Sequence, residues 1–573
     1  MINTIRNDDH QVILAFFGFI IFCTFLGTQY PELFILEVFI IIVTVGSLYY
    51  LDCPRGFYYW AVFIIGLSLV FQTTLITTQL IGSDVHNEAF YANLSLSNGW
   101  NINIVDPQNT SAVNTVLVPL MAFLTRTPVI WIYKVILPII YMGLPLGMLL
   151  LFERYVDIKN AFMSVFLFMG ITTFFTEVPS IGKQMVAEVI LIALFIGMVK
   201  GWRWYWLALL AIGVAISHYA LAWVLAIILA VVLIVQICYQ KWRKLAQIGV
   251  VMAILCVFSY VYFANVAGGT CLDRFYLALG RENNTAVAAI TNSGSDNSSP
   301  AETVKIDMRD GLVKTMVGAD FNQTDLQGKA GRILVFAIEG LLVTGYIFLM
   351  RRKDVDTVFK GIISGSLVIL IVCVWHPSFA GLLNMTRFLH ICLITLSLAG
   401  IYAAIKIFKY KVLILSMVCA LFIFTSGFVF EATKVTDLTN ITLPYSIGMS
   451  AWRTDVGGVL TNNDAALADW CIENDIRPIY ADMNSFLLLQ ERYGNEGIIA
   501  ITQDTKEIDG YFFIREWNSD HESMTVWNGP GARVFLDADY WNDNWVVIDA
   551  ENTMTIGNAS LGKVHVVKEE HGE

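Results

Sequence analysis

The sequence predicts a multi-pass α-helical membrane protein that carries a small α/β domain at its C-terminus. Three observations lead to this fold class. Of the 573 residues, 56% are hydrophobic and only 14% are charged, whereas soluble domains are about 45–50% apolar and about 25% charged. Thirteen segments are apolar enough to be candidate membrane spans. The charge is also divided, because residues 431–573 hold 24 acidic and 9 basic residues while the first 430 hold 23 acidic and 27 basic.

The candidate spans follow from the length that a bilayer requires, about 20 mostly apolar residues for one helix. The first candidate has Arg6 before it and no small-residue cleavage site, so we interpret it as a retained anchor. Three domains are predicted: a transmembrane hairpin (1–56), a transmembrane domain with outer loops 81–128 and 267–330 (57–430), and an acidic domain (431–573). The thirteen candidate spans are 12–28, 33–51, 57–80, 129–152, 161–176, 184–199, 204–217, 218–238, 246–266, 331–350, 361–375, 390–405 and 412–429.

Basic residues in the short loops predict how the spans are oriented, because Lys and Arg accumulate on the cytoplasmic side. With the N-terminus in the cytoplasm, sixteen basic residues fall on the inner side. The opposite short loops carry only Arg126, Lys183 and Arg387. Thirteen spans then place the C-terminal domain outside the cell, and we expect a multi-pass protein of the cell membrane.

The predicted outer segments differ in pattern. In loop 81–128, residues 89–96 are amphipathic and 116–124 form an apolar run that we expect to lie along the membrane interface. The acidic domain alternates a helical pattern with strand patterns, which is typical of a small α/β domain. Its negative charge argues against nucleic acid as a partner. The helical pattern covers 465–474, and the strand patterns cover 479–481, 510–515, 545–548 and 563–567.

The strongest polar signal is the sequence Gly-Ser-Asp-Val-His-Asn-Glu at 82–88, directly after the third predicted span. An extended backbone would direct Asp84, His86 and Glu88 to one face, whereas a helix would bring Asp84 and Glu88 together. Either arrangement can bind a divalent cation such as Mg²⁺ or Mn²⁺, or set one carboxylate to accept a proton. The alternative is structural, with Ser83 or Asp84 capping a helix.

Further polar residues occupy other predicted outer turns. Glu177 and Lys183 lie between the fifth and sixth spans, where Lys183 either binds a phosphate group or extends along the helix end toward water. His218 and Tyr219 form the turn between the seventh and eighth spans, and a capping histidine is the structural alternative. A further pair, Arg387 and His390, begins the twelfth span, where an unpaired guanidinium is costly and a phosphate or carboxylate partner is expected.

Other chemistry lacks support in the sequence. The chain contains no GxxxxGK[ST], GxSxG, HExxH or GxGxxG motif, which argues against nucleotide hydrolysis, serine-hydrolase and zincin activities. No CxxC pair is present either, and six of nine cysteines lie in apolar segments. A disulfide between Cys271 and Cys471, the two in predicted outer segments, is left open by the sequence.

The order of these features resembles the GT-C glycosyltransferase fold, whose members include protein mannosyltransferases and oligosaccharyltransferase catalytic subunits. The resemblance covers about residues 57–430. It is carried by 82–88, by Ser217-His218-Tyr219 and by Thr386-Arg387-Phe388, which look most like a group of uncharacterised archaeal multi-pass proteins. Two signatures differ: the mannosyltransferase Asp-Glu pair is Asp-x-His-x-Glu here, and the oligosaccharyltransferase Trp-Trp-Asp sequence is absent.

The resemblance implies an enzyme that takes a sugar from a polyprenyl-phosphate donor. An acidic residue of the first outer loop is the base in such enzymes, and by position this is Asp84. Lys183 and Arg387, with His218 and Tyr219, would then lie near the donor phosphate, and an extracytoplasmic protein or glycan would be the acceptor. Two other classes stay open: a transporter or exporter of a lipid-linked or anionic solute, and a non-catalytic envelope protein.

Overall fold

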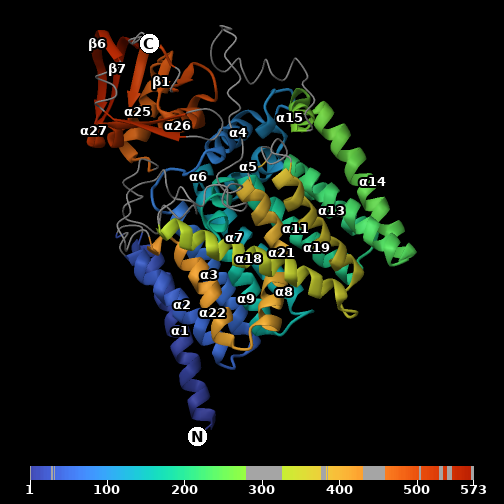
Figure 1. Cartoon of the computed structure of the whole chain (residues 1–573). Coiled ribbons are helices and arrows are strands. Elements are labelled where there is room, and N and C mark those ends of the chain that lie inside the picture. Colours follow the sequence, from blue (N-terminus) through green and yellow to red (C-terminus); the bar gives the residue numbers. More distant parts are fainter. Residues whose placement is uncertain are drawn as a thin grey trace.

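The computed structural model consists of a bundle of apolar helices and a small domain of mixed sheet at one end of it (Figure 1). It describes residues 2–27, 30, 33–278, 326–375, 383, 385–429, 459–502, 505–527, 533–537 and 545–568. Most of the predicted outer loop 267–330 and the first part of the predicted acidic domain therefore lie outside the described residues.

The first half of the bundle is an almost unbroken succession of helices whose buried faces share one apolar core. Two of the helical segments within it are π-helical, at 113–117 and 132–136. In chain order the helices are α1 (Ile2–Gly27), α2 (Leu33–Tyr50), α3 (Arg55–Thr74), α4 (Asp84–Asn98), η1 (Pro107–Thr110), η2 (Val113–Leu117), α5 (Val118–Thr125), α6 (Val129–Trp131), η3 (Ile132–Ile136), α7 (Leu137–Tyr141) and α8 (Gly143–Phe152).

The second half of the bundle closes around the same core. Helix α18 packs along α21, and α13 packs along α19. The remaining helices are α9 (Ile158–Met169), α10 (Thr172–Phe175), η4 (Val178–Ser180), α11 (Gly182–Lys200), α12 (Trp204–Ser217), α13 (Tyr219–Cys238), α14 (Trp242–Asn265), η5 (Ala267–Gly269), α15 (Thr270–Ala278), α18 (Leu326–Arg351), α19 (Thr357–Trp375), α21 (Met385–Ile407) and α22 (Lys411–Thr425).

All thirteen predicted spans are helical in the described residues. Nine helices there are long and apolar enough to cross a membrane, and a tenth span is formed if α9 and the helices at 172–180, which bend by 74°, are counted together. The other three predicted spans are shorter apolar helices, at 11–27, 204–217 and 411–425. The multi-pass helical fold class is confirmed, with up to ten full-length spans where the sequence predicts about thirteen.

The two ends of the bundle differ in the side chains they expose. One end carries α4 and is called the α4 end here. At the opposite end, exposed tryptophans lie in the first two turns of helices, as Trp60, Trp204 and Trp242 do. Tryptophans in such positions are typical of a membrane–water interface. At the α4 end, the apolar run 116–124, which we expect to lie along the membrane interface, is helical. The Phe123 side chain in it is 72% exposed.

The C-terminal domain contains a five-stranded mixed sheet in the order β2-β1-β3-β7-β6 and a separate two-stranded sheet, β4-β5. Strand β1 is parallel to β2 and β3, whereas β7 is antiparallel to both of its neighbours. The predicted helix and all four predicted strands are present. The elements are α25 (Asn462–Glu473), β1 (Ile479–Ala481), α26 (Met483–Tyr493), β2 (Ile498–Ala500), β3 (Glu507–Ile514), α27 (Glu516–His521), β4 (Ser523–Trp527), β5 (Arg533–Asp537), β6 (Trp545–Ile556) and β7 (Ala559–Lys568).

The two cysteines whose pairing the sequence does not decide lie in different hydrophobic cores. Cys271 is buried at the α4 end beside the Thr110 hydroxyl, 3.4 Å from its sulfur. Cys471 is buried under the sheet of the C-terminal domain. Both are free thiols, so each acts as a small apolar side chain.

Candidate functional site

The candidate site begins at the N-terminus of α4, which approaches the 176–183 segment closely. Gly82 has φ +114°, and a Cβ placed on it would lie 2.1 Å from Cβ of Ser180. Only glycine therefore permits this approach without a shift of the neighbouring chain. The following residues turn directly into a helix, with Ser83 at the N-cap position and Asp84 in the first turn. The helical alternative for this segment is thus the one observed.

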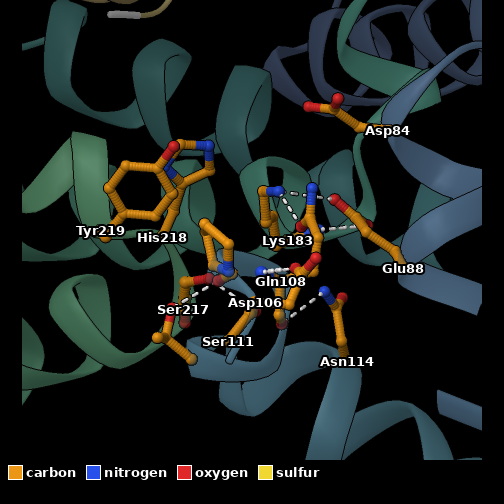
Figure 2. A network of polar contacts seen from close by, with 12 residues as sticks. Asp84, Glu88, Asp106, Gln108, Ser111, Asn114, Lys183, Ser217, His218 and Tyr219 are labelled. Atoms are coloured by element: carbon orange, nitrogen blue, oxygen red, sulfur yellow. Dashed lines mark hydrogen bonds and ion pairs between the residues drawn. The ribbon is translucent and has the colours of Figure 1, made fainter. Parts of the chain in front are cut away.

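The helix brings Asp84 and Glu88 to one face, because residues four apart lie one above the other (Figure 2). Asp84 remains 31% exposed, and its Oδ2 lies 3.5 Å from Nη1 of Arg387. Burial acts to raise the pKa of Asp84, but the positive charges of Lys183 and Arg387 outweigh it and lower the pKa below its ordinary value. This carboxylate is therefore ionised at neutral pH and remains accessible.

Glu88 and Lys183 form a buried pair one helical turn deeper. Glu88 Oε1 lies 3.3 Å from Lys183 Nζ, with side-chain exposures of 0% and 4%. Glu88 Oε2 also accepts a hydrogen bond of 3.2 Å from the backbone N–H of Lys183, and Lys183 Nζ donates to Oε1 of Gln108. Burial, together with the negative charge of Asp84, raises the pKa of Glu88 to about 7 in spite of Lys183.

Arg387 is the second cation of the site and is only loosely paired. Its Nε lies 4.0 Å from Oε2 of Glu177, and that oxygen already accepts a hydrogen bond of 2.7 Å from the Thr386 hydroxyl. Nε of Arg387 is buried and has no hydrogen-bond partner within the described part of the chain. Because a buried donor without an acceptor is costly, this guanidinium is suited to bind an additional anion.

His218 and Tyr219 lie on the far side of the pair formed by Lys183 and Glu88 (Figure 2). His218 caps α13, since its Nδ1 accepts a hydrogen bond of 3.3 Å from the backbone N–H of Leu221. Burial first, and then the charges of Lys183 and Arg387, lower the pKa of His218 well below its ordinary value. The ring is therefore neutral, and the predicted structural role as a cap is observed.

The other two histidines of the predicted site point elsewhere. His86 Nδ1 lies 2.8 Å from Oε2 of Glu491, a residue of the C-terminal domain. His390 lies deeper in the bundle, where its Nε2 is 3.1 Å from both Oε2 of Glu188 and the Tyr141 hydroxyl. Neither ring faces Asp84, because each forms its hydrogen bonds with buried residues that do not belong to the group around Asp84, Glu88 and Lys183.

The expected cation site at Asp84, His86 and Glu88 is not formed. On a helix, the second of these residues points away from the other two, and it contacts Glu491 as described. No group of three or more His, Cys, Asp or Glu side chains within the described ranges is arranged to hold a metal ion. These three residues therefore do not fit Mg²⁺ or Mn²⁺.

Sequence reasoning missed three residues of the cluster. Asp106 caps η1 and accepts a hydrogen bond of 2.7 Å from the backbone N–H of Gln108, which in turn contacts Lys183. Arg274, from α15, donates a hydrogen bond of 3.1 Å to the Tyr219 hydroxyl. A possible signal was Asp106-Pro107, a typical helix start, but no spacing in the sequence connects these segments to 82–88.

The comparison with solved structures finds a likeness to a known membrane protein. Among solved structures, the chain is similar to the arabinofuranosyltransferase AftD from mycobacteria, with a TM-score of 0.39 and 12% sequence identity. The match covers 76% of this chain and 30% of that chain, so this chain corresponds to less than a third of that protein. No family model and no curated protein matches the sequence. By its own residues, the chain is a multi-pass helical membrane protein with a C-terminal mixed-sheet domain.

Proposed function

We propose that the protein is a membrane glycosyltransferase that moves a sugar from a polyprenyl-phosphate carrier to an acceptor outside the cytoplasm. One observation supports this most strongly: an accessible, ionised carboxylate, Asp84, lies next to a partly buried cation, Arg387, whose buried Nε has no hydrogen-bond acceptor in the described part of the chain. A carboxylate can remove a proton from an acceptor hydroxyl. A cation with free donors can stabilise the phosphate that leaves.

In the proposed reaction, the acceptor oxygen attacks the anomeric carbon of the sugar from the face opposite the phosphate. The new carbon–oxygen bond forms as the bond between the anomeric carbon and the phosphate oxygen breaks, which inverts the anomeric configuration. Asp84 takes the acceptor proton, and the electron pair of the broken bond stays on the polyprenyl phosphate. Lys183 and Arg387 stabilise that charge. His218 and Tyr219 would support Lys183 from the far side of the cluster.

A cavity that reaches Thr386, the chain neighbour of Arg387, supports the proposal of a lipid-linked donor. It is lined by Thr386, Leu389 and Leu393 of α21, by apolar side chains of α18 and α22, by Glu339 of α18, and by Thr172 and Thr425. The apolar part of this cavity would receive the isoprene unit next to the phosphate, with the phosphate itself at the Thr386 end. Glu177, bonded to Thr386, would then set the position of the cation that receives the phosphate.

The orientation of the protein is part of the proposal. Basic residues collect at the end opposite to α4, and Lys and Arg favour the cytoplasmic side. We therefore assign the α4 end and the C-terminal domain to the extracytoplasmic side of the cell membrane, where a protein or glycan would be the acceptor. No step is derived through a divalent cation, because Asp84, His86 and Glu88 do not fit one.

The test is transfer of radiolabelled sugar from a panel of polyprenyl-phosphate sugars by purified protein. Wild type is compared with Asp84→Asn and with Asp52→Asn, a matched control at the opposite end whose side chain is 85% exposed. We expect transfer by wild type and by Asp52→Asn, and a loss of about 10²–10⁴-fold in Asp84→Asn. Equal transfer by all three would exclude Asp84 as the base. Polyprenyl-phosphate binding without transfer from any donor would favour a carrier or exporter instead.

A further inference from the structure

A buried hydrogen-bonded pair attaches the C-terminal domain to α4. His86 of α4 and Glu491 of α26 approach to 2.8 Å, and their side chains are 2% and 4% exposed. These residues are 405 positions apart in the sequence. Removing one partner of a hydrogen bond buried to this degree is costly, because the remaining polar group loses this partner without gaining water. The contact therefore ties the domain to this helix and not merely to the bundle surface.

The position of this pair on α4 matters for the candidate site. His86 lies midway between Asp84 and Glu88 in sequence, and successive helical residues are rotated by about 100°. A residue two positions along therefore points to nearly the opposite side of the helix. Holding His86 on the side of α26 fixes the rotation of α4 about its axis, and this rotation directs Asp84 and Glu88 toward Lys183 and Arg387.

Two further contacts support the same attachment. Gly494, directly after α26, has φ +70°, and a Cβ on it would lie 2.8 Å from Cζ of Phe90 on α4. In the segment that precedes α4, the Thr77 hydroxyl donates to the carbonyl of Leu460. The domain thus holds both α4 and the chain that leads into it.

The surroundings of Glu491 are cationic and tightly packed. Besides His86, its carboxylate is contacted by Arg492 on its own helix, and Lys134 lies near enough to interact with it electrostatically. Nζ of Lys134 donates hydrogen bonds to the carbonyls of Thr77 and Gln79, the latter at 2.6 Å. The Glu491 carboxylate therefore contacts α4 directly and acts electrostatically on a lysine that holds the 77–79 segment.

We infer that Glu491 is a positioning residue, and that the C-terminal domain holds Asp84 in its working orientation through the buried Glu491–His86 pair. This inference rests on the proposed function only in taking Asp84 as the catalytic base. The domain then acts on the site through α4, without any of its own side chains touching the reacting atoms. His86 belongs to this contact as a second positioning residue.

The test uses the full chain and the isosteric variant Glu491→Gln. Hydrogen exchange in residues 84–98 is measured by mass spectrometry, beside turnover at saturating polyprenyl-phosphate sugar. We expect faster exchange across α4 and a turnover that is about 10- to 100-fold lower, with KM for the donor changed by less than about twofold. Glu496→Gln is the matched control, because that side chain is 87% exposed just beyond α26; we expect it to change neither quantity. Unchanged exchange across α4 in Glu491→Gln would overturn the inference.

A double-mutant cycle with His86→Gln separates this pair from general damage to the domain. His86→Gln leaves α26 intact, so it perturbs the contact from the bundle side. If the two residues act through one contact, the double variant loses no more turnover than either single variant. Losses that multiply would mean that the residues act separately, which would overturn the inference.

Failure of the proposed function would be recognised independently. If wild type transfers sugar from no donor while Glu491→Gln still raises exchange across α4, the glycosyltransferase proposal fails and the positioning of α4 stands. If wild type transfers sugar and the exchange and turnover of Glu491→Gln equal those of wild type, the positioning role fails and the proposed function stands.

Discussion

The two ends of the bundle use their charged side chains in different ways. At the end opposite to α4, the ion pairs are short and open to solvent. At the α4 end, the three pairs of the candidate site are longer, and none of their side chains is more than 31% exposed. The short pairs are Arg55–Glu153 at 2.6 Å, Lys159–Asp52 at 2.7 Å and Lys244–Asp356 at 2.6 Å, and the long ones are Lys183–Glu88 at 3.3 Å, Arg387–Asp84 at 3.5 Å and Arg387–Glu177 at 4.0 Å.

This difference indicates what each end is built for. Short pairs near water satisfy both partners and join helix ends, as Lys244 and Asp356 join α14 to α19. Such pairs contribute little to stability, since solvent screens them. Charges that are buried and kept apart are costly for folding. Holding Lys183 buried and Arg387 partly buried in this way adds nothing to stability by itself, but an anion bound between them would meet one buried and one partly buried cation.

The largest effect is expected from Lys183→Met, which leaves Glu88 as a buried carboxylate without its cation. Removal of one partner of such a pair costs about 3–5 kcal/mol, so we expect a lower unfolding temperature and no measurable transfer. The double variant Lys183→Met/Glu88→Gln removes both charges and should regain most of the thermal stability but no transfer. Recovery of transfer in the double variant would show that Lys183 only neutralises Glu88 and does not act on the donor.

Arg387→Gln tests the difference between the two ends of the bundle at a loosely paired cation of the α4 end. Its Nε already lacks an acceptor in the described chain, so the change should hardly affect the unfolding temperature. We expect transfer to fall by about 10²-fold, the size of effect seen when one stabilising donor is removed. Lys244→Gln is the matched control from the opposite end. If both variants transfer equally well, the two ends do not differ in function.

Much of the fold could be predicted from local composition. A membrane span is recognised because one long apolar stretch is enough, and all thirteen predicted segments are helices. The strands of the C-terminal domain follow their alternating pattern in the same way. Lengths were harder to predict: 204–217 is a helix of 14 residues, shorter than a bilayer-spanning helix. In such cases apolar composition reflects burial among neighbouring helices as well as contact with lipid.

The candidate site could be predicted only where its residues adjoin a span. Asp84, Lys183 and Arg387 stand out because charges beside apolar segments are unusual, and the structure brings them together. Asp106 and Arg274 could not be identified, since Asp106, the N-cap of η1, and Arg274, in α15, reach the site only through tertiary packing. His86 was assigned to the cluster from alternation alone. The helical turn at Asp84 and a partner 405 residues away direct it to the C-terminal domain instead.

The pH dependence of donor binding offers a finer test of the long pairs. The pKa of Glu88 is raised to about 7, so this carboxyl is neutral below that pH and leaves the charge of Lys183 uncompensated. As the pH rises through 7, Glu88 ionises and competes with the donor phosphate. Affinity for a polyprenyl-phosphate sugar, a phosphodiester that does not titrate in this range, should therefore weaken severalfold. Its dissociation constant is measured from pH 5.5 to 8.5, within the usual range of such titrations.

Glu88→Gln is the control for that titration. The glutamine cannot ionise, so the dissociation constant should become flat across the same range. Stability should depend on pH in the same direction as donor binding, because the pKa of Glu88 is higher in the folded than in the unfolded chain. The contribution of Glu88 to stability is therefore present below the pKa of the unfolded chain and is lost as the pH rises through 7. A pH dependence that persists unchanged in Glu88→Gln would assign the titration to another group.

The smallest effect is expected at the opposite end, and it tests whether the short pairs are as dispensable as their exposure indicates. Nζ of Lys244 and Oδ2 of Asp356 are 2.6 Å apart, with side-chain exposures of 39% and 27%. Lys244→Gln should lower the free energy of unfolding by less than about 1 kcal/mol, and the difference should shrink further in 1 M salt. Thermal unfolding of both proteins at low and high salt measures this. If Lys244→Gln lowered the free energy of unfolding as much as Lys183→Met does, charges at the opposite end would support the fold as strongly as those at the α4 end. The distances and exposures of the ion pairs would then not distinguish the two ends.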